Sequence, residues 1–263
     1  MPSLIDIGLN LTDKSFDKDR DEVIARATEA GVHTMILTGS TVECSKLACT
    51  LAKTRPGLLF STAGVHPHHA AECDDATIPA LRDVATLPEV VAVGECGLDF
   101  FRNFSPPEAQ EKWMDAQLQL AVDLQMPVFL HERDAHESFA AILRNHIQRL
   151  PDAVVHCFTG ARAALDDYLT MGCHIGVTGW ICDERRGKDL QELVKHIPID
   201  RLLVETDAPY LLPRDLKPKP KERRNEPCHL PHVTRRIAEC IGQDFEAVAA
   251  ATTENARRFF RLP

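Results

Sequence analysis

The sequence predicts an α/β protein of the TIM (β/α)8 barrel class. Three observations support this: the chain length, eight short apolar runs, and helical spacing between those runs. The 263 residues agree with the roughly 250 residues of such a barrel, although two smaller domains would also fit. Hydrophobic residues make up 44% and charged residues 26% of the chain. This ordinary composition excludes a disordered or collagen-like chain.

Eight runs of apolar or β-branched residues are expected to be strands. Most are apolar throughout, which is typical of parallel strands that are covered on both faces. The runs are Leu4–Leu9, Thr34–Thr38, Leu58–Val65, Val90–Gly94, Pro127–His131, Ala153–Cys157, Cys173–Thr178 and Leu202–Thr206. An open doubly wound sheet is the alternative. The sequence lacks both G-x-G-x-x-G and the P-loop motif, which removes two common uses of such a sheet.

Helical patterns separate the expected strands. Residues 111–125 place apolar side chains such as Trp113 and Leu120 on one side of a helix. Ser105, followed by two prolines and a glutamate, predicts a capped helix start. Gly31 and Gly172 are expected just beyond helix ends. No flexible linker divides the chain, so a single domain over residues 1–263 is expected.

The composition also bears on location and partners. The nine cysteines are odd in number and form no C-x-x-C pair, which is unlike a secreted disulfide scaffold. The first residues lack the pattern of a signal peptide, and no apolar run reaches the roughly 20 residues needed to span a bilayer. A cytoplasmic monomer without membrane contact is therefore expected. The net charge of −9 argues against bulk coating of nucleic acid but allows a local grip on phosphates.

Side chains that suit divalent metals lie at the carboxyl ends of five expected strands. They are His66, Glu95, His131, His156 and Asp207. In a barrel these ends meet at one mouth, where such enzymes place their chemistry. Unpaired imidazoles and acids gathered there would be costly without a cation, so the pattern predicts a metal site. Imidazole with carboxylate suits Zn, Mn, Fe or Co, and allows Mg where oxygen ligands dominate.

Strand alternation predicts which side chains face the barrel axis. Val91 and Val93 are expected on the face of Glu95, and Phe129 on the face of His131. Cys96, next to Glu95, should then point toward the helices.

Two other metal-like motifs are not expected to bind metal. His131-Glu132-Arg133-Asp134-Ala135-His136 has one residue too many for the zincin helix motif H-E-x-x-H. The stretch from Cys228 to His232 has no second cysteine nearby and does not predict a zinc finger.

Six motifs in this order resemble the TatD family of metal-dependent deoxyribonucleases, over essentially the whole chain. They are Ala63–His68, Gly94–Phe100, Pro127–His131, His156–Gly160, Glu205–Tyr210 and Arg224–Pro227. The resemblance implies a barrel of the amidohydrolase type. It also implies 3′→5′ exonuclease activity on single-stranded DNA and RNA, in DNA repair or degradation, with Mg as the usual activator. Mn or Zn are alternatives that the ligand types allow.

The resemblance further implies a ligand set. Glu95, His131 and His156 would hold the metal, and Asp207 and His66 would complete the site. Most relatives carry Asp-x-His-x-His on the first strand, but here the stretch is Asp6-Ile7-Gly8-Leu9-Asn10. Because both histidines are absent, one firm metal is expected, with any second metal held weakly by Glu95, Asp207 and water.

The predicted roles follow from phosphodiester hydrolysis. Asp207, helped by Glu205, would orient or deprotonate the attacking water, and His66 would contact the phosphate or the leaving group. Basic and aromatic residues in the loops at the mouth are expected to bind the nucleic acid. They are Arg133, Phe104, Arg185, Arg186, Arg223 and Arg224. The last two end a segment, Arg214–Arg224, with six basic and two acidic residues.

Two alternative functions remain open at this point. Amidohydrolase-type barrels also cleave esters and amides, so a deacylase of D-aminoacyl-tRNA is one alternative. A barrel that has lost its first-strand histidines and only binds a partner is the other. Metal analysis and assays on oligonucleotide and aminoacyl-tRNA would separate the three.

Overall fold

The computed structural model describes residues 3–263, so Met1 and Pro2, which belong to the expected domain 1–263, lie outside it. The chain forms two compact units. One contains the chain up to Ile36 and from Ile175 onward, and the other contains Leu37–His174. The expectation of one domain stays a prediction.

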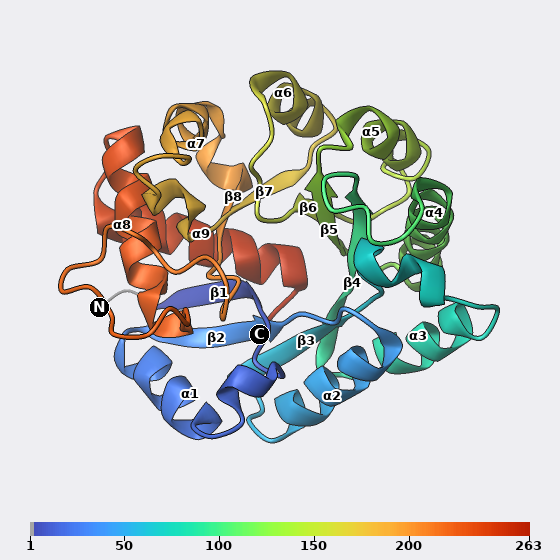
Figure 1. Cartoon of the computed structure of the whole chain (residues 1–263), viewed down its shortest axis with the longest axis horizontal. Coiled ribbons are helices and arrows are strands. Elements are labelled where there is room, and N and C mark those ends of the chain that lie inside the picture. Colours follow the sequence, from blue (N-terminus) through green and yellow to red (C-terminus); the bar gives the residue numbers. More distant parts are fainter. Residues whose placement is uncertain (1–2) are drawn as a thin grey trace. The chain divides into compact units, whose positions relative to one another are not determined.

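The unit Leu37–His174 is a run of parallel strands with helices packed on one side of them (Figure 1). Its strands pair in sequence order, β3 with β4, β4 with β5, and β5 with β6. These strands are β3 (Leu59–Ala63), β4 (Val90–Asp99), β5 (Val128–Arg133) and β6 (Ala153–Val155). The helices are α2 (Val42–Lys53), the 3-10 helix η2 (Pro67–Glu72), α3 (Thr77–Ala85), α4 (Pro107–Leu124), α5 (His136–Arg144) and α6 (Arg162–Thr170).

The other unit holds the first and last strands of the chain, and these two lie side by side. The backbone N–H of Asp207 donates to the carbonyl of Gly8 at 2.9 Å. The strands are β1 (Leu4–Leu9), β2 (Val32–Leu37), β7 (His174–Val177) and β8 (Leu202–Val204), of which Leu37 and His174 belong to the other unit. The first strand beside the last is typical of a closed barrel rather than of an open doubly wound sheet.

The helices of this unit include two long ones, α8 and α9, which pack on β1 and β8. Its α-helices are α1 (Arg20–Glu29), α7 (Lys188–Leu193), α8 (Leu230–Ile241) and α9 (Phe245–Phe260). Its 3-10 helices are η1 (Lys14–Phe16), η3 (Gly179–Cys182), η4 (Val194–His196), η5 (Ile199–Arg201) and η6 (Pro227–His229).

All eight predicted strands are present, and β1 is buried throughout as expected. Gly31 and Gly172 follow α1 and α6 with positive φ, which confirms both predicted helix ends. The predicted cap at Ser105 is wrong, because α4 has no side-chain cap. The Ser105 hydroxyl instead accepts from the N–H of Ala71 and donates to the carbonyl of His68.

A bulge in β4 changes which side chains face His131. Gly94 pairs with Phe129, and Gly97 pairs with His131. Two residues lie between the paired positions on β4, but only one lies between them on β5. The extra residue reverses the alternation. Val93 pairs with Val128 and so lies on the face opposite Phe129. The predicted common face of Val91, Val93 and Glu95 is therefore wrong, whereas Cys96, paired with Leu130, does face away from His131.

Two glycines allow β4 to approach β5 closely around this bulge. Gly94 has φ +135°, and a Cβ there would lie 2.2 Å from the carbonyl oxygen of Phe129. Gly97 has φ +145°, and its Cβ would lie 1.9 Å from the carbonyl oxygen of His131. Only glycine fits either position. The two glycines thus flank Glu95 and hold its segment against β5.

Replacing Gly97 by alanine tests this constraint. Gly97→Ala should lower the free energy of unfolding by about 3 kcal/mol, because both the dihedral angle and the clash with the strand backbone oppose the methyl group. Gly57→Ala is the matched control, since Gly57 also has positive φ (+80°) but has no atom within 4 Å of its Cβ position. Urea unfolding measures both. An equal loss in the two variants would contradict the close approach of the strands.

Candidate active site

Three imidazole nitrogens converge on one carboxylate oxygen. Glu95 Oε1 lies 2.7 Å from His156 Nε2, 3.0 Å from His131 Nδ1 and 3.3 Å from His66 Nε2. All four residues belong to the unit Leu37–His174 and lie on or just after β3, β4, β5 and β6. The structure therefore brings together four of the five predicted strand-end residues.

The backbone positions each ring. His66 caps η2, and its Nδ1 accepts the backbone N–H of His68 at 3.1 Å. A neutral His66 therefore carries its proton on Nε2, the atom that faces Glu95. The backbone N–H of His156 donates to the carbonyl of Leu130 at 2.9 Å, and its ring packs on Phe129 with centroids 4.6 Å apart.

Asp99 and His68 are two site residues that the sequence analysis missed. Asp99 is fully buried at the end of β4. Its Oδ2 accepts from His68 Nε2 at 2.7 Å and lies 3.5 Å from His131 Nε2. The apolar run was expected to end at Gly94, which left Asp99 in a loop. The sequence does contain a pattern that predicts the longer strand, because the apolar run continues through Leu98. It places Asp99 two residues beyond Gly97 and therefore on the same face of the strand as Gly97.

The charges of the cluster oppose one another. Burial raises the pKa of Glu95, but His156, His66 and His131 outweigh it and hold that pKa well below its ordinary value. The pKa of Asp99 is also lowered, because hydrogen bonds from His131 and His68 outweigh its burial. Burial lowers the pKa of His66 to about 4. For His131, burial lowers the pKa, but Asp99 and Glu95 together raise it overall.

The residues present fit a divalent metal ion. His131 lies between the buried carboxylates of Glu95 and Asp99, and this arrangement favours positive charge at this place. Its Nε2 is turned toward Asp99, which leaves Nδ1 for a metal and forms the carboxylate–histidine pair common around metal ligands. With His156 Nε2 and Glu95 Oε1, this gives two nitrogens and one oxygen. His66 suits a donor better, because its proton is on the atom that faces the cluster.

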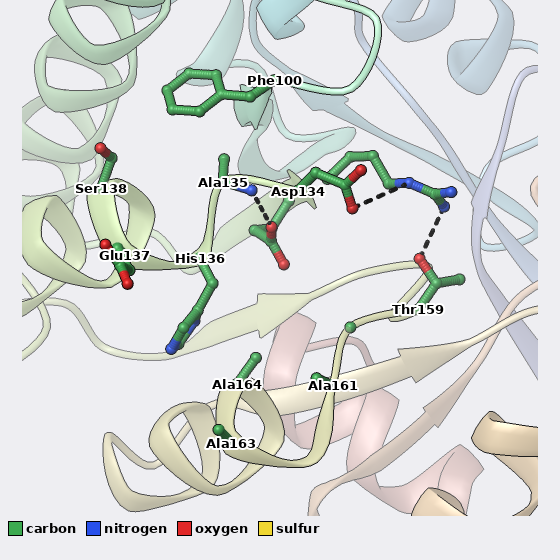
Figure 2. Close-up of a pocket in the computed structure, with 13 residues that line it drawn as sticks. Phe100, Asp134, Ala135, His136, Glu137, Ser138, Thr159, Ala161, Ala163 and Ala164 are labelled. Carbon is green, nitrogen blue, oxygen red and sulfur yellow. Dashed lines mark hydrogen bonds and ion pairs between the residues drawn. The ribbon is translucent and has the colours of Figure 1, made fainter.

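A pocket of about 470 Å³ opens beside β5, and Arg133 and His136 contribute to its lining. Its other lining residues are Phe100, Glu132, Asp134, Ala135, Glu137, Ser138, Thr159, Gly160, Ala161, Ala163 and Ala164. Figure 2 shows that the wall is formed by the start of α5, by Phe100 and by the segment from Thr159 to Ala164. Arg133 lies two residues after His131 on β5 and so shares its face.

The guanidinium of Arg133 is fixed in place. Its Nη1 donates to Thr159 Oγ1 at 3.0 Å (Figure 2), and it lies 5.0 Å from the ring centroid of Phe101. Phe104 is 69% exposed, and its ring lies 4.8 Å from that of His68. Both predicted contacts, Arg133 and Phe104, therefore lie close to the histidine cluster within this unit.

Asp207 and Glu205 lie in the other unit, and their part in the reaction stays a prediction. Asp207 directly follows β8 with φ +54°, and its Oδ1 accepts from Asn10 Nδ2 at 3.2 Å. This hydrogen bond helps to hold the side chain of Asp207 in place. Glu205 is fully buried. Burial raises the pKa of Asp6 to about 8, although Thr206 donates two hydrogen bonds to it.

The remaining predicted contacts differ in their surroundings. Arg185 and Arg223 are exposed. Arg186 stacks on Trp180, 4.4 Å from the ring centroid, and pairs with Asp183. The guanidinium of Arg224 is bound by Asp19 and Glu226, and its side chain is 15% exposed. Arg224 is therefore held by acidic groups of the protein itself. Its contact with nucleic acid stays a prediction, and these ion pairs do not favour it.

Comparison with known proteins decides the family. The profile of TatD-related DNases matches residues 5–261. The chain belongs to the TatD-related DNase family. The resemblance found in the sequence is thereby confirmed. A Pectobacterium carotovorum protein named 3′-5′ ssDNA/RNA exonuclease TatD is 56% identical to this chain, and the match covers 98% of this chain and all of the relative. A protein of the same name from Erwinia billingiae is 55% identical, and the match covers 99% of this chain and all of the relative.

Solved structures of the family have the same fold. A TatD homologue from Escherichia coli has a TM-score of 0.90 and 29% identity, over 99% of this chain and 98% of that one. A TatD family hydrolase from Entamoeba histolytica has a TM-score of 0.89 and 27% identity, over 98% of each chain. The predicted (β/α)8 barrel class is confirmed. The prediction of a nuclease is confirmed as well, because the family consists of TatD-related DNases. This family does not favour the deacylase or the non-enzymatic alternative.

No helix within residues 3–263 combines the length and the apolar character needed to cross a bilayer.

Removing the charge of Asp99 tests its role behind His131. Asp99→Asn should weaken Mn²⁺ binding by about 10- to 100-fold, since it no longer orients the ring or raises its basicity. Isothermal titration calorimetry measures the affinity. Asp123→Asn is the control, because Asp123 is an exposed acid of α4 that pairs with Arg82. Unchanged Mn²⁺ affinity in a folded Asp99→Asn protein would remove Asp99 from the site.

Proposed function

We propose that the chain is a divalent-metal-dependent 3′→5′ exonuclease that acts on single-stranded DNA and RNA. The observation that carries the proposal is the convergence of His66, His131 and His156 on Glu95, in a chain whose relatives at 55–56% identity are named for this activity. The donor types, their burial and their place at strand ends support phosphodiester hydrolysis.

The metal ligands in this proposal are Glu95, His131 and His156, with Asp207 completing the shell. A bound metal ion would polarise the phosphoryl oxygen and lower the pKa of the attacking water. Asp99 lies beside His131 Nε2 and would leave Nδ1 available as a metal ligand. We propose Mg²⁺ as the ion, with Mn²⁺ or Zn²⁺ as substitutes, and a second weak site at Glu95 and Asp207 that keeps most of its water.

The other residues handle protons and the substrate. His66 Nε2–H, aimed at the cluster, donates to a phosphate oxygen or to the leaving oxygen. Asp207, held by Asn10 through Nδ2, accepts the proton of the attacking water, and the buried carboxylate of Glu205 supports it.

The pocket beside β5 suits the terminal nucleotide. Its volume falls within the usual range of small-molecule pockets, about 300–1,000 Å³. Arg133 offers a fixed cation for a phosphate, and Phe101 and Phe104 offer exposed rings for bases. Arg185, Arg186 and the exposed lysines near Arg223 would contact more distant phosphates. Nothing in this arrangement favours an aminoacyl ester, so the deacylase is not proposed.

We also propose that the enzyme works as a monomer in the cytoplasm and takes part in DNA repair or degradation. The odd number of cysteines and the absence of a C-x-x-C pair support a reducing compartment.

Replacing Glu95 tests the function most simply. Glu95→Ala should lower nuclease turnover on the order of 1,000-fold, because several kcal/mol of metal-dependent stabilisation disappear. The assay follows single-stranded oligonucleotides labelled at either end, with excess Mg²⁺ and with chelator. Glu43→Ala is the control, since Glu43 is an exposed acid of α2. Full turnover by Glu95→Ala, or release of nucleotides from the 5′ end, would overturn the proposal.

Replacing Arg133 tests the substrate pocket. Arg133→Gln should weaken oligonucleotide binding and reduce the slope of log K against log salt by about 0.7, the value for one phosphate contact on a single strand. Fluorescence anisotropy in chelator measures binding without turnover. Arg144→Gln, at an exposed residue of α5 that pairs with Asp167, should keep the wild-type slope. The same slope in both variants would place Arg133 outside the binding surface.

A further inference from the structure

A second group of metal-ligating side chains lies in the unit that contains α8. Cys182 ends η3, Asp215 lies in the segment after β8, and His232 lies in the first turn of α8. One ligand atom from each lies within 4.8 Å of the other two. Asp215 Oδ1 is 2.7 Å from His232 Nε2. None of the three was given a role from the sequence, where His232 was considered only with Cys228.

We propose that Cys182, Asp215 and His232 bind a divalent metal ion of borderline softness, above all Zn²⁺. One thiolate, one imidazole and one carboxylate are the ligand types of protein zinc sites. The thiolate is a soft ligand that the Glu95 cluster does not offer, so this site favours softer metal ions than that cluster does. The proposal is independent of the nuclease activity.

The ligand atoms lie within 4.8 Å of one another, so binding an ion requires them to adjust by about 1 Å. In a tetrahedral zinc site the ligand atoms lie roughly 3.3–3.6 Å from one another, as follows from the usual Zn–N, Zn–O and Zn–S bond lengths. The hydrogen bond between Asp215 and His232 must therefore lengthen by less than about 1 Å, which rotation of a carboxylate provides. The side chains of Asp215 and His232 are 35% and 30% exposed. A fourth, water-filled position is thus accessible from solvent.

The charges of the group also balance. Cys182 is buried, and burial together with Asp215 raises the pKa of its thiol, so it is protonated before a metal binds. Binding replaces this proton: the S–H bond breaks, the S–Zn bond forms, and one proton passes to solvent. The thiolate and the carboxylate then neutralise the two charges of the ion, with neutral His232 as the third ligand. The nearby cation Arg236 has its own partner in Glu239.

The ion would connect three segments of the chain. Asp215 directly follows Arg214, which pairs with Glu184, two residues beyond Cys182. The site therefore joins the loop after β7, the basic segment Arg214–Arg224 and the start of α8. This is a structural role, in which the ion fixes the basic segment.

Cobalt titration of the full chain tests the proposal. Co²⁺ bound to a thiolate gives a near-ultraviolet charge-transfer band that nitrogen and oxygen ligands do not give. In metal-free Glu95→Ala protein, where the first cluster is disabled, one equivalent of Co²⁺ should produce this band. Zn²⁺ should then displace the Co²⁺, and one proton should be released for each ion bound.

Variants assign the band to its ligands. Cys182→Ser should abolish it, whereas Cys157→Ser, beside the first cluster, and Cys240→Ser, on α8, should keep it. Asp215→Asn, at a partly exposed residue, should weaken Co²⁺ binding at least tenfold. This variant tests the site if Cys182→Ser does not fold. Absence of the band in Glu95→Ala protein, or a band that survives both Cys182→Ser and Asp215→Asn, would overturn the proposal.

Discussion

The close approach of β4 to β5 is the constraint on which the candidate site depends. Gly94 and Gly97 let the two backbones come within a distance that any Cβ would prevent. Between them the bulge turns Glu95 toward the imidazoles of His131 and His156. A regular strand continued from the Gly94–Phe129 pair would turn both Glu95 and Asp99 to the face opposite His131. The two glycines thus shape the candidate site through the backbone.

The buried carboxylates give the site its preference for a cation. Two carboxylates, Glu95 and Asp99, lie on either side of His131, and the surrounding groups hold both ionised. Such an arrangement is costly in a buried place unless positive charge compensates it. A protonated imidazole can do so in part, and a divalent metal ion does so more completely. Asp99 orients His131, whereas the backbone N–H of His68 fixes the tautomer of His66 and leaves its Nε2–H facing the cluster.

Much of this could be predicted from the sequence. The eight strands follow from apolar runs, and the strand-end histidines and acids follow from the rule that barrel chemistry lies at carboxyl ends. The reversed face of Val93 could not be predicted, because alternation assumes a strand without a bulge. Asp99 was missed because the fourth strand was expected to end at Gly94, whereas β4 continues to Asp99. The role of Asn10, which holds Asp207, depends on a contact between β1 and the end of β8 that no local pattern predicts. Arg224 was expected to contact phosphate, but it pairs with Asp19 and Glu226. Asp19 is far away in the sequence, and Glu226 looks there like an ordinary surface acid, so neither pair could be predicted.

The central claim is that Glu95, His131 and His156 together bind the catalytic metal. Anomalous diffraction from crystals soaked in Mn²⁺ tests it most directly, because the signal locates the ion without assumptions about activity. The account predicts a peak within bonding distance of Glu95 Oε1, His131 Nδ1 and His156 Nε2 that disappears in Glu95→Ala crystals. An active, Mn²⁺-loaded enzyme whose anomalous peaks all lie away from these three atoms would contradict it.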